Sequence, residues 1–129
     1  MVSWQILQEA VERAKGRRIL LIDTCHSGNA YNERLGNAAY DANFIACTAA
    51  RFDQTSREDD ALGHGLFTYA VLEGFEGKGG IAAHRQISTK ELADYVIKRV
   101  EELAKAQKAE KEPQYFKRRD AEDYVLARW

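Results

Sequence analysis

Cys25 is the residue of this sequence best suited to covalent chemistry. It lies three residues beyond the aliphatic run Ile19–Ile22, and Ser27 and Gly28 follow it. In open α/β sheets, reactive groups gather in the loops at the carboxyl edge, where the sulfur would be exposed and nearby backbone N–H groups would face a developing oxyanion. The thiolate is the reacting form, and a free cysteine with a pKa of about 8.5 needs a neighbouring base or positive charge to populate it near neutrality. The alternative is that Cys25 is an inert residue that ends a strand.

A buried strand must position Cys25, and the sequence before it predicts one. Ile19–Ile22 is unbroken by polar residues, as expected for a strand covered on both faces in a mostly parallel sheet flanked by helices. A second short buried strand is predicted for residues 43–48, and the Gly-, Asn- and Ser-rich residues 24–42 between the two strands predict a surface loop. An amphipathic helix precedes the first strand and ends near Gly16. Its apolar positions are Trp4, Leu7, Val11 and Ala14.

The second half of the chain predicts two helices and a last strand. Residues 51–65 are polar and acidic and predict a loop, and the apolar stripe in residues 66–75 predicts a helix. Residues 88–91, Ser-Thr-Lys-Glu, form a capping box that begins a longer helix, which Pro113 must stop. Residues 124–127 supply a last strand. This order of elements is that of a layered α/β domain.

Composition limits the classes of function. The 20 acidic and 19 basic residues nearly balance, so the sequence gives no sign of a nucleic-acid or membrane partner. No apolar run approaches the roughly 20 residues that span a bilayer, and residues 1–18 contain no signal-peptide core, so we expect a cytoplasmic protein. Its 129 residues make one domain or a portion of one. In that compartment Cys25 and Cys47 are expected to be reduced thiols.

Residues 23–28, Asp-Thr-Cys-His-Ser-Gly, resemble the nucleophile motif of caspase-like cysteine peptidases, especially metacaspases and their prokaryotic orthocaspase relatives. The resemblance continues downstream. Residues 46–50, Ala-Cys-Thr-Ala-Ala, and then 53–56, Asp-Gln-Thr-Ser, look like the next strand and specificity loop of these families. Residues 63–69, Gly-His-Gly-Leu-Phe-Thr-Tyr, are similar to the start of the following helix. Order and spacing match from about residue 17 to residue 77, and more loosely beyond.

The resemblance implies that residues 1–129 are the C-terminal portion of a single caspase-like peptidase domain, a three-layer sandwich whose N-terminal strands are missing. The implied activity is that of a Cys-His endopeptidase. The Cys25 thiolate attacks a peptide carbonyl, and the acyl-enzyme is hydrolysed without a cofactor. In these families the catalytic histidine lies upstream of every motif seen in this chain. His26, His64 and His84 do not match its position, so the isolated chain is expected to be inactive until an N-terminal segment joins it.

Two carboxylates are the candidate substrate-binding residues. In metacaspases the aspartate that matches Asp23 helps line the pocket for an arginine or lysine before the cleaved bond, and Asp53 lies in the adjacent loop region. A carboxylate facing a guanidinium gives a strong charge-assisted pairing. The alternative for each residue is that its carboxylate only stabilises a turn or loop. For Asp53 this alternative is the favoured interpretation. Cleavage after aspartate, as in classical caspases, also stays open because Arg51 and Arg57 lie in the same loop.

No metal site is assigned from the sequence. Some metacaspases require calcium, and Asn32 stands where a remaining carboxylate ligand would be expected, so a calcium requirement is left open. A zinc site has no compact ligand pair to support it. The residues considered for it are Cys25, His26, Cys47 and His64.

A second function remains open beside the peptidase. A caspase-like module that has lost the histidine would bind a partner or scaffold an assembly without catalysis, and the fold alone does not decide between the two. If the early strands are absent, one strand edge and part of an apolar face should be exposed, and the chain would then be prone to form homo-oligomers. The expected partners are therefore a protein or peptide substrate, the histidine-bearing segment and a second copy.

Overall fold

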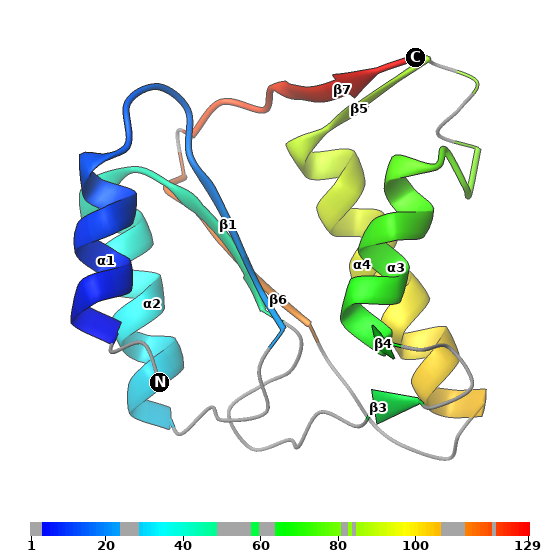
Figure 1. The fold of residues 1–129 in the computed structure, drawn as a ribbon, viewed down its shortest axis with the longest axis horizontal. Helices are drawn as coiled ribbons and strands as arrows, with labels where there is room; N and C mark the ends of the chain where they lie inside the picture. The colour runs from blue at the N-terminus through cyan, green and yellow to red at the C-terminus, as the bar shows by residue number, and fades with distance from the viewer. Residues whose placement is uncertain are drawn as a thin grey trace.

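The computed structural model describes residues 4–23, 29–48, 58–59, 64–80, 83, 85–106, 113–119 and 121–129. In these ranges the chain is a small mixed α/β domain with four helices, a few short strands and no closed barrel (Figure 1). The helices are α1 Trp4–Arg13, α2 Asn29–Ala42, α3 Leu66–Phe75 and α4 Thr89–Ala106. The strands are β1 Ile19–Ile22, β2 Ile45–Thr48, β3 Glu58–Asp59, β4 His64–Gly65, β5 Gln86–Ser88, β6 Gln114–Phe116 and β7 Val125–Arg128.

The central sheet has the order β1-β2-β6. β1 and β2 run parallel, with Ile19 opposite Ile45 and Ile22 opposite Thr48, whereas β6 pairs with β2 antiparallel. Two further antiparallel pairs, β3 with β4 and β5 with β7, lie outside this sheet. The prediction of a mostly parallel sheet is therefore wrong for the described strands. It failed because the two- and three-residue strands are too short to show an alternating or continuous apolar pattern.

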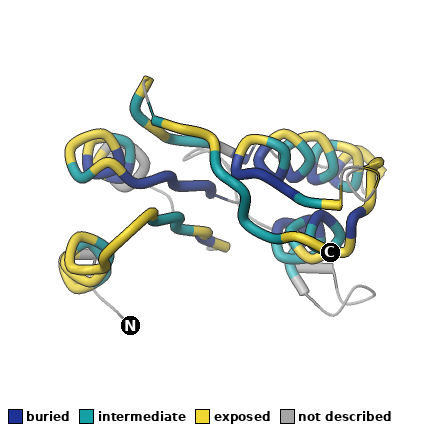
Figure 2. Tube along the Cα trace, turned by 90° about the horizontal axis from the view of Figure 1, so that it is seen from above, coloured by how far each residue is buried: buried dark blue, intermediate teal, exposed yellow. Residues whose placement is uncertain are grey.

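Helices cover both faces of the central sheet because successive side chains of a strand point to opposite sides. Ala46 of β2 belongs to an apolar cluster with α2, and its neighbour Cys47 belongs to a second cluster with α3 and α4. Both residues are buried, and Figure 2 shows the dark, buried central strand between the helical layers. The first strand is less covered: Leu21 of β1 is 37% exposed, and β1 pairs with only one described strand.

Helix α2 replaces most of the predicted loop over residues 24–42. The prediction missed it because its buried face has one large apolar residue, Leu35, beside the small residues Ala38 and Ala39 in an otherwise polar sequence. Gly36 has a packing role on the same helix, since a Cβ atom there would lie 3.3 Å from Cδ1 of Phe116 in β6. Small residues thus allow α2 to lie close to the sheet, although they give a weak helical signal.

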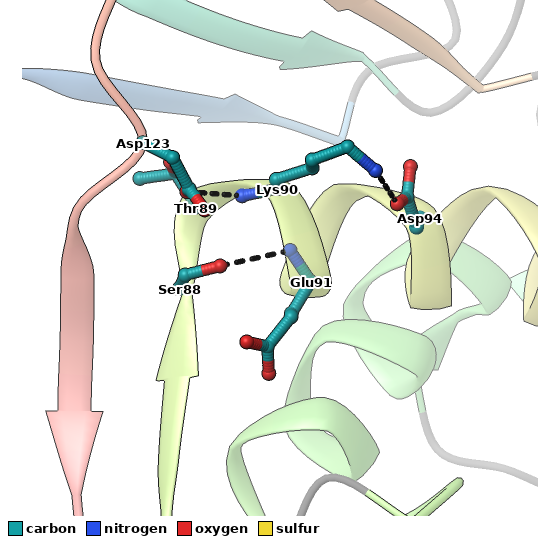
Figure 3. Close-up of polar contacts among 6 residues, drawn as sticks. All are labelled: Ser88, Thr89, Lys90, Glu91, Asp94 and Asp123. Atoms are coloured by element: carbon teal, nitrogen blue, oxygen red, sulfur yellow. Dashed lines mark hydrogen bonds and ion pairs between the residues drawn. The ribbon is translucent and has the colours of Figure 1, made fainter.

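The N-terminus of α4 confirms half of the predicted capping box (Figure 3). The backbone N–H of Glu91 donates to the Ser88 hydroxyl at 3.2 Å, whereas the Glu91 Oε2 atom is buried without a partner in the described structure. Asp123, from the segment before β7, supplies a further acceptor that the capping box does not include. Its Oδ1 atom accepts from the Lys90 backbone N–H at 2.9 Å and from the Thr89 hydroxyl at 2.6 Å. A carboxylate distant in sequence therefore satisfies donors of the first turn.

The other predicted elements agree with the structure within a few residues. Helices α1 and α3 lie where the apolar spacing placed them, and the last strand is one residue later than predicted. α4 is described to Ala106, and residues 107–112 before Pro113 lie outside the described ranges. Across the ranges that the structure describes, no helix combines the length and the apolar character needed to cross a bilayer.

Candidate active site

The carboxyl ends of β1 and β2 form the edge at which the sequence predicts the site. The two strands are parallel, and Ile22 and Thr48 are directly opposite at their ends. Cys25 follows Ile22 by three residues, and Asp53 follows Thr48 by five. Residues 24–28 and 49–57 lie outside the described part of the chain, so the predictions for Cys25, His26, Asp53, Arg51 and Arg57 stay predictions.

Asp23 is the described member of the predicted site. It is exposed, and its Oδ2 atom accepts a hydrogen bond from the Thr68 hydroxyl at 2.5 Å. The same carboxylate lies against Gly65, where a Cβ atom would stand 2.8 Å from Oδ2. Gly65 is the N-cap residue of α3 and provides no side-chain cap of its own. The Asp23 carboxylate thus lies at the N-terminal, positive end of the α3 dipole.

This contact brings together segments from two of the three motifs that carried the sequence resemblance. Asp23 begins the first motif, and Gly65 and Thr68 belong to the third. The second motif contains β2, which is hydrogen-bonded to β1. Segments more than 40 residues apart in sequence therefore meet at one edge of the sheet, beside the point where the chain continues toward Cys25.

The sequence placed Gly65 and Thr68 in a motif at the start of a helix and gave neither a role in the site. The signal that could have identified them is a glycine directly before an apolar helical stripe, followed by a hydroxyl residue in the first turn. A glycine in that position leaves room for a group from elsewhere to approach the helix start. The identity of that group, Asp23, depends on the tertiary fold and has no local signature.

Cys47 is unsuited to nucleophilic chemistry. Its thiol is free, as predicted, and the residue is 3% exposed within the apolar cluster between the sheet, α3 and α4. Burial raises the pKa of this thiol to about 12, because an apolar environment disfavours the charged thiolate. Cys47 lies within β2 and its side chain belongs to the core, so the nucleophile assignment stays with Cys25 as a prediction.

No metal site emerges from the described residues. In that part of the chain there is no group of three or more His, Cys, Asp or Glu residues that could hold a metal ion. Of the residues considered for zinc, Cys47 lies in an apolar cluster, and Cys25 and His26 lie outside the described ranges. His84 also lies outside them, and Asn32 is described only as part of the α2 backbone.

A cavity of about 640 Å³ lies away from the candidate site. It is lined by residues of α3, α4 and the turn between them, and neither Asp23 nor Thr68 contributes to it. Glu73 and Arg99 line it and pair with each other across the two helices, with Nε of Arg99 2.7 Å from Oε2 of Glu73. This cavity is therefore separate from the candidate site at the carboxyl ends of β1 and β2.

Comparisons with protein-family models, with curated proteins and with solved structures each found no match for this chain.

Proposed function

We propose that this chain is the C-terminal portion of a caspase-like cysteine endopeptidase domain, with Cys25 as the nucleophile and the activating histidine supplied from outside the chain. The observation that carries the proposal is that the described residues of the three motifs lie together at the carboxyl ends of β1 and β2. Asp23 follows β1, β2 pairs with β1, and Asp23 contacts the start of α3. A loop that leaves this edge directly after a buried strand is a common location for catalytic groups in α/β sheets.

The side of β1 that faces away from β2 pairs with no described strand, which supports the proposal that a further N-terminal segment completes the sheet. β1 is aliphatic throughout, yet Leu21 is 37% exposed and β1 pairs only with β2 among the described strands. A strand added in parallel beside β1 would lie about 4.8 Å away, and its carboxyl end would reach the edge from which Cys25 follows. An N-terminal segment carrying the histidine therefore has a place to dock that would bring an imidazole near the sulfur.

The proposed substrate preference is for arginine or lysine before the cleaved bond. Asp23 is exposed at the candidate edge, and Thr68 and Gly65 fix its position. A carboxylate has about four lone-pair positions, and the Thr68 hydroxyl takes one of them, so Asp23 keeps the capacity to accept from a guanidinium. Asp53 is the proposed second carboxylate of the same pocket.

Reconstitution tests the proposal. The chain is co-expressed with the segment encoded upstream of Met1 and assayed with fluorogenic peptides that contain arginine or lysine. We expect cleavage by the reconstituted pair, negligible cleavage by either part alone, and loss of cleavage in Cys25→Ala. Cys47→Ala is the matched control, because it removes the buried thiol and should keep activity. Cleavage that survives Cys25→Ala would refute the assigned nucleophile.

A non-catalytic caspase-like module is the second candidate. It is favoured by the hydrogen bond from Thr68, which gives Asp23 a structural role at the start of α3 that needs no substrate. Such a module would remain inactive after reconstitution and would bind its protein partner equally well with alanine at position 25. Reconstitution and a pull-down with the Cys25→Ala variant therefore separate the two functions.

A further inference from the structure

We draw no further inference here: the strongest candidate, the cavity of about 640 Å³ lined by α3, α4 and the turn between them, carries none, because Glu73 and Arg99 on its wall already pair with each other, the buried unpartnered Oε2 atom of Glu91 is inaccessible to a ligand, and nothing in the described structure shows what would fill the cavity.

Discussion

The contrast between the two cysteines gives the most direct test of the structure. Cys47 is 3% exposed, and burial raises the pKa of its thiol to about 12. At about pH 8 a thiol with that pKa is ionised to only about one part in ten thousand, whereas a free cysteine with a pKa of about 8.5 is ionised to about one quarter. Alkylation of Cys47 in the folded chain should therefore be slower than in the unfolded chain by roughly a thousandfold or more, because the thiolate is the reacting species.

Intact-mass measurement of iodoacetamide labelling follows this difference. We expect the folded chain to gain one alkyl group at Cys25 and the second only after unfolding in guanidinium. Two single-cysteine variants assign the sites: Cys25→Ala should resist labelling when folded, and Cys47→Ala should react readily. Rapid labelling of folded Cys25→Ala would contradict the buried position of Cys47. Equal resistance of folded Cys47→Ala would contradict an accessible nucleophile at position 25.

The same burial predicts a pH dependence of stability. Because the pKa of the Cys47 thiol is raised in the folded state, its contribution to the free energy of unfolding is complete at pH values below the pKa of the unfolded thiol. This stabilising contribution is lost as the pH rises toward about 12. Above the unfolded pKa of about 8.5 the loss approaches about 1.4 kcal/mol per pH unit. Urea unfolding of the unmodified chain and of Cys47→Ala should therefore converge in stability as the pH rises.

Three further substitutions test the packing. Asp123→Ala removes the carboxylate that caps the first turn of α4 and should lower the free energy of unfolding by about 1–2 kcal/mol in urea. Gly65→Ala places a Cβ atom 2.8 Å from the Asp23 carboxylate and should cost about 1–3 kcal/mol through local overpacking, seen as a lower melting temperature. Arg99→Met should cost about 2 kcal/mol, because Glu73 is only 12% exposed and loses its charged partner, although it keeps the hydrogen bond from the Tyr95 hydroxyl. Since the hydrogen bond from Arg99 lowers the pKa of Glu73, this cost should disappear as the pH falls below about 4.

The elements that the sequence predicted well are those with a strong apolar period or an unbroken aliphatic run. Strands β1 and β2 and helix α3 have such patterns, and all three lie where the sequence placed them. Helix α2 was missed because Ala38 and Ala39 give its buried face too little contrast with its polar residues. A helix whose buried face is made of small side chains depends on close approach to the sheet for its stability, and that approach is a tertiary property.

The strand directions and the caps could not be predicted locally. β6 pairs antiparallel with β2 although only three residues form it, and no periodic pattern distinguishes them from a loop. At α4 the sequence correctly identified Ser88 as the cap, yet the second acceptor is Asp123 rather than Glu91. Both outcomes depend on where the segment after α4 returns to the sheet, and local sequence does not encode that path.

At the candidate site, too, the local sequence identified the residue and the tertiary fold determined its contacts. Asp23 was singled out from its motif, whereas its contact with Thr68 and Gly65 follows from the packing of α3 against the end of β1. A structural role for Asp23 does not argue against a role in substrate binding, because a pocket carboxylate must be held in place before it can select a guanidinium. Thr68→Val and Thr68→Ser separate the two roles in the reconstituted enzyme. If Asp23 acts only at the start of α3, the valine variant should lower stability and leave the preference for arginine over neutral residues unchanged. If Asp23 also lines the pocket, that preference should fall in the valine variant and be restored by serine.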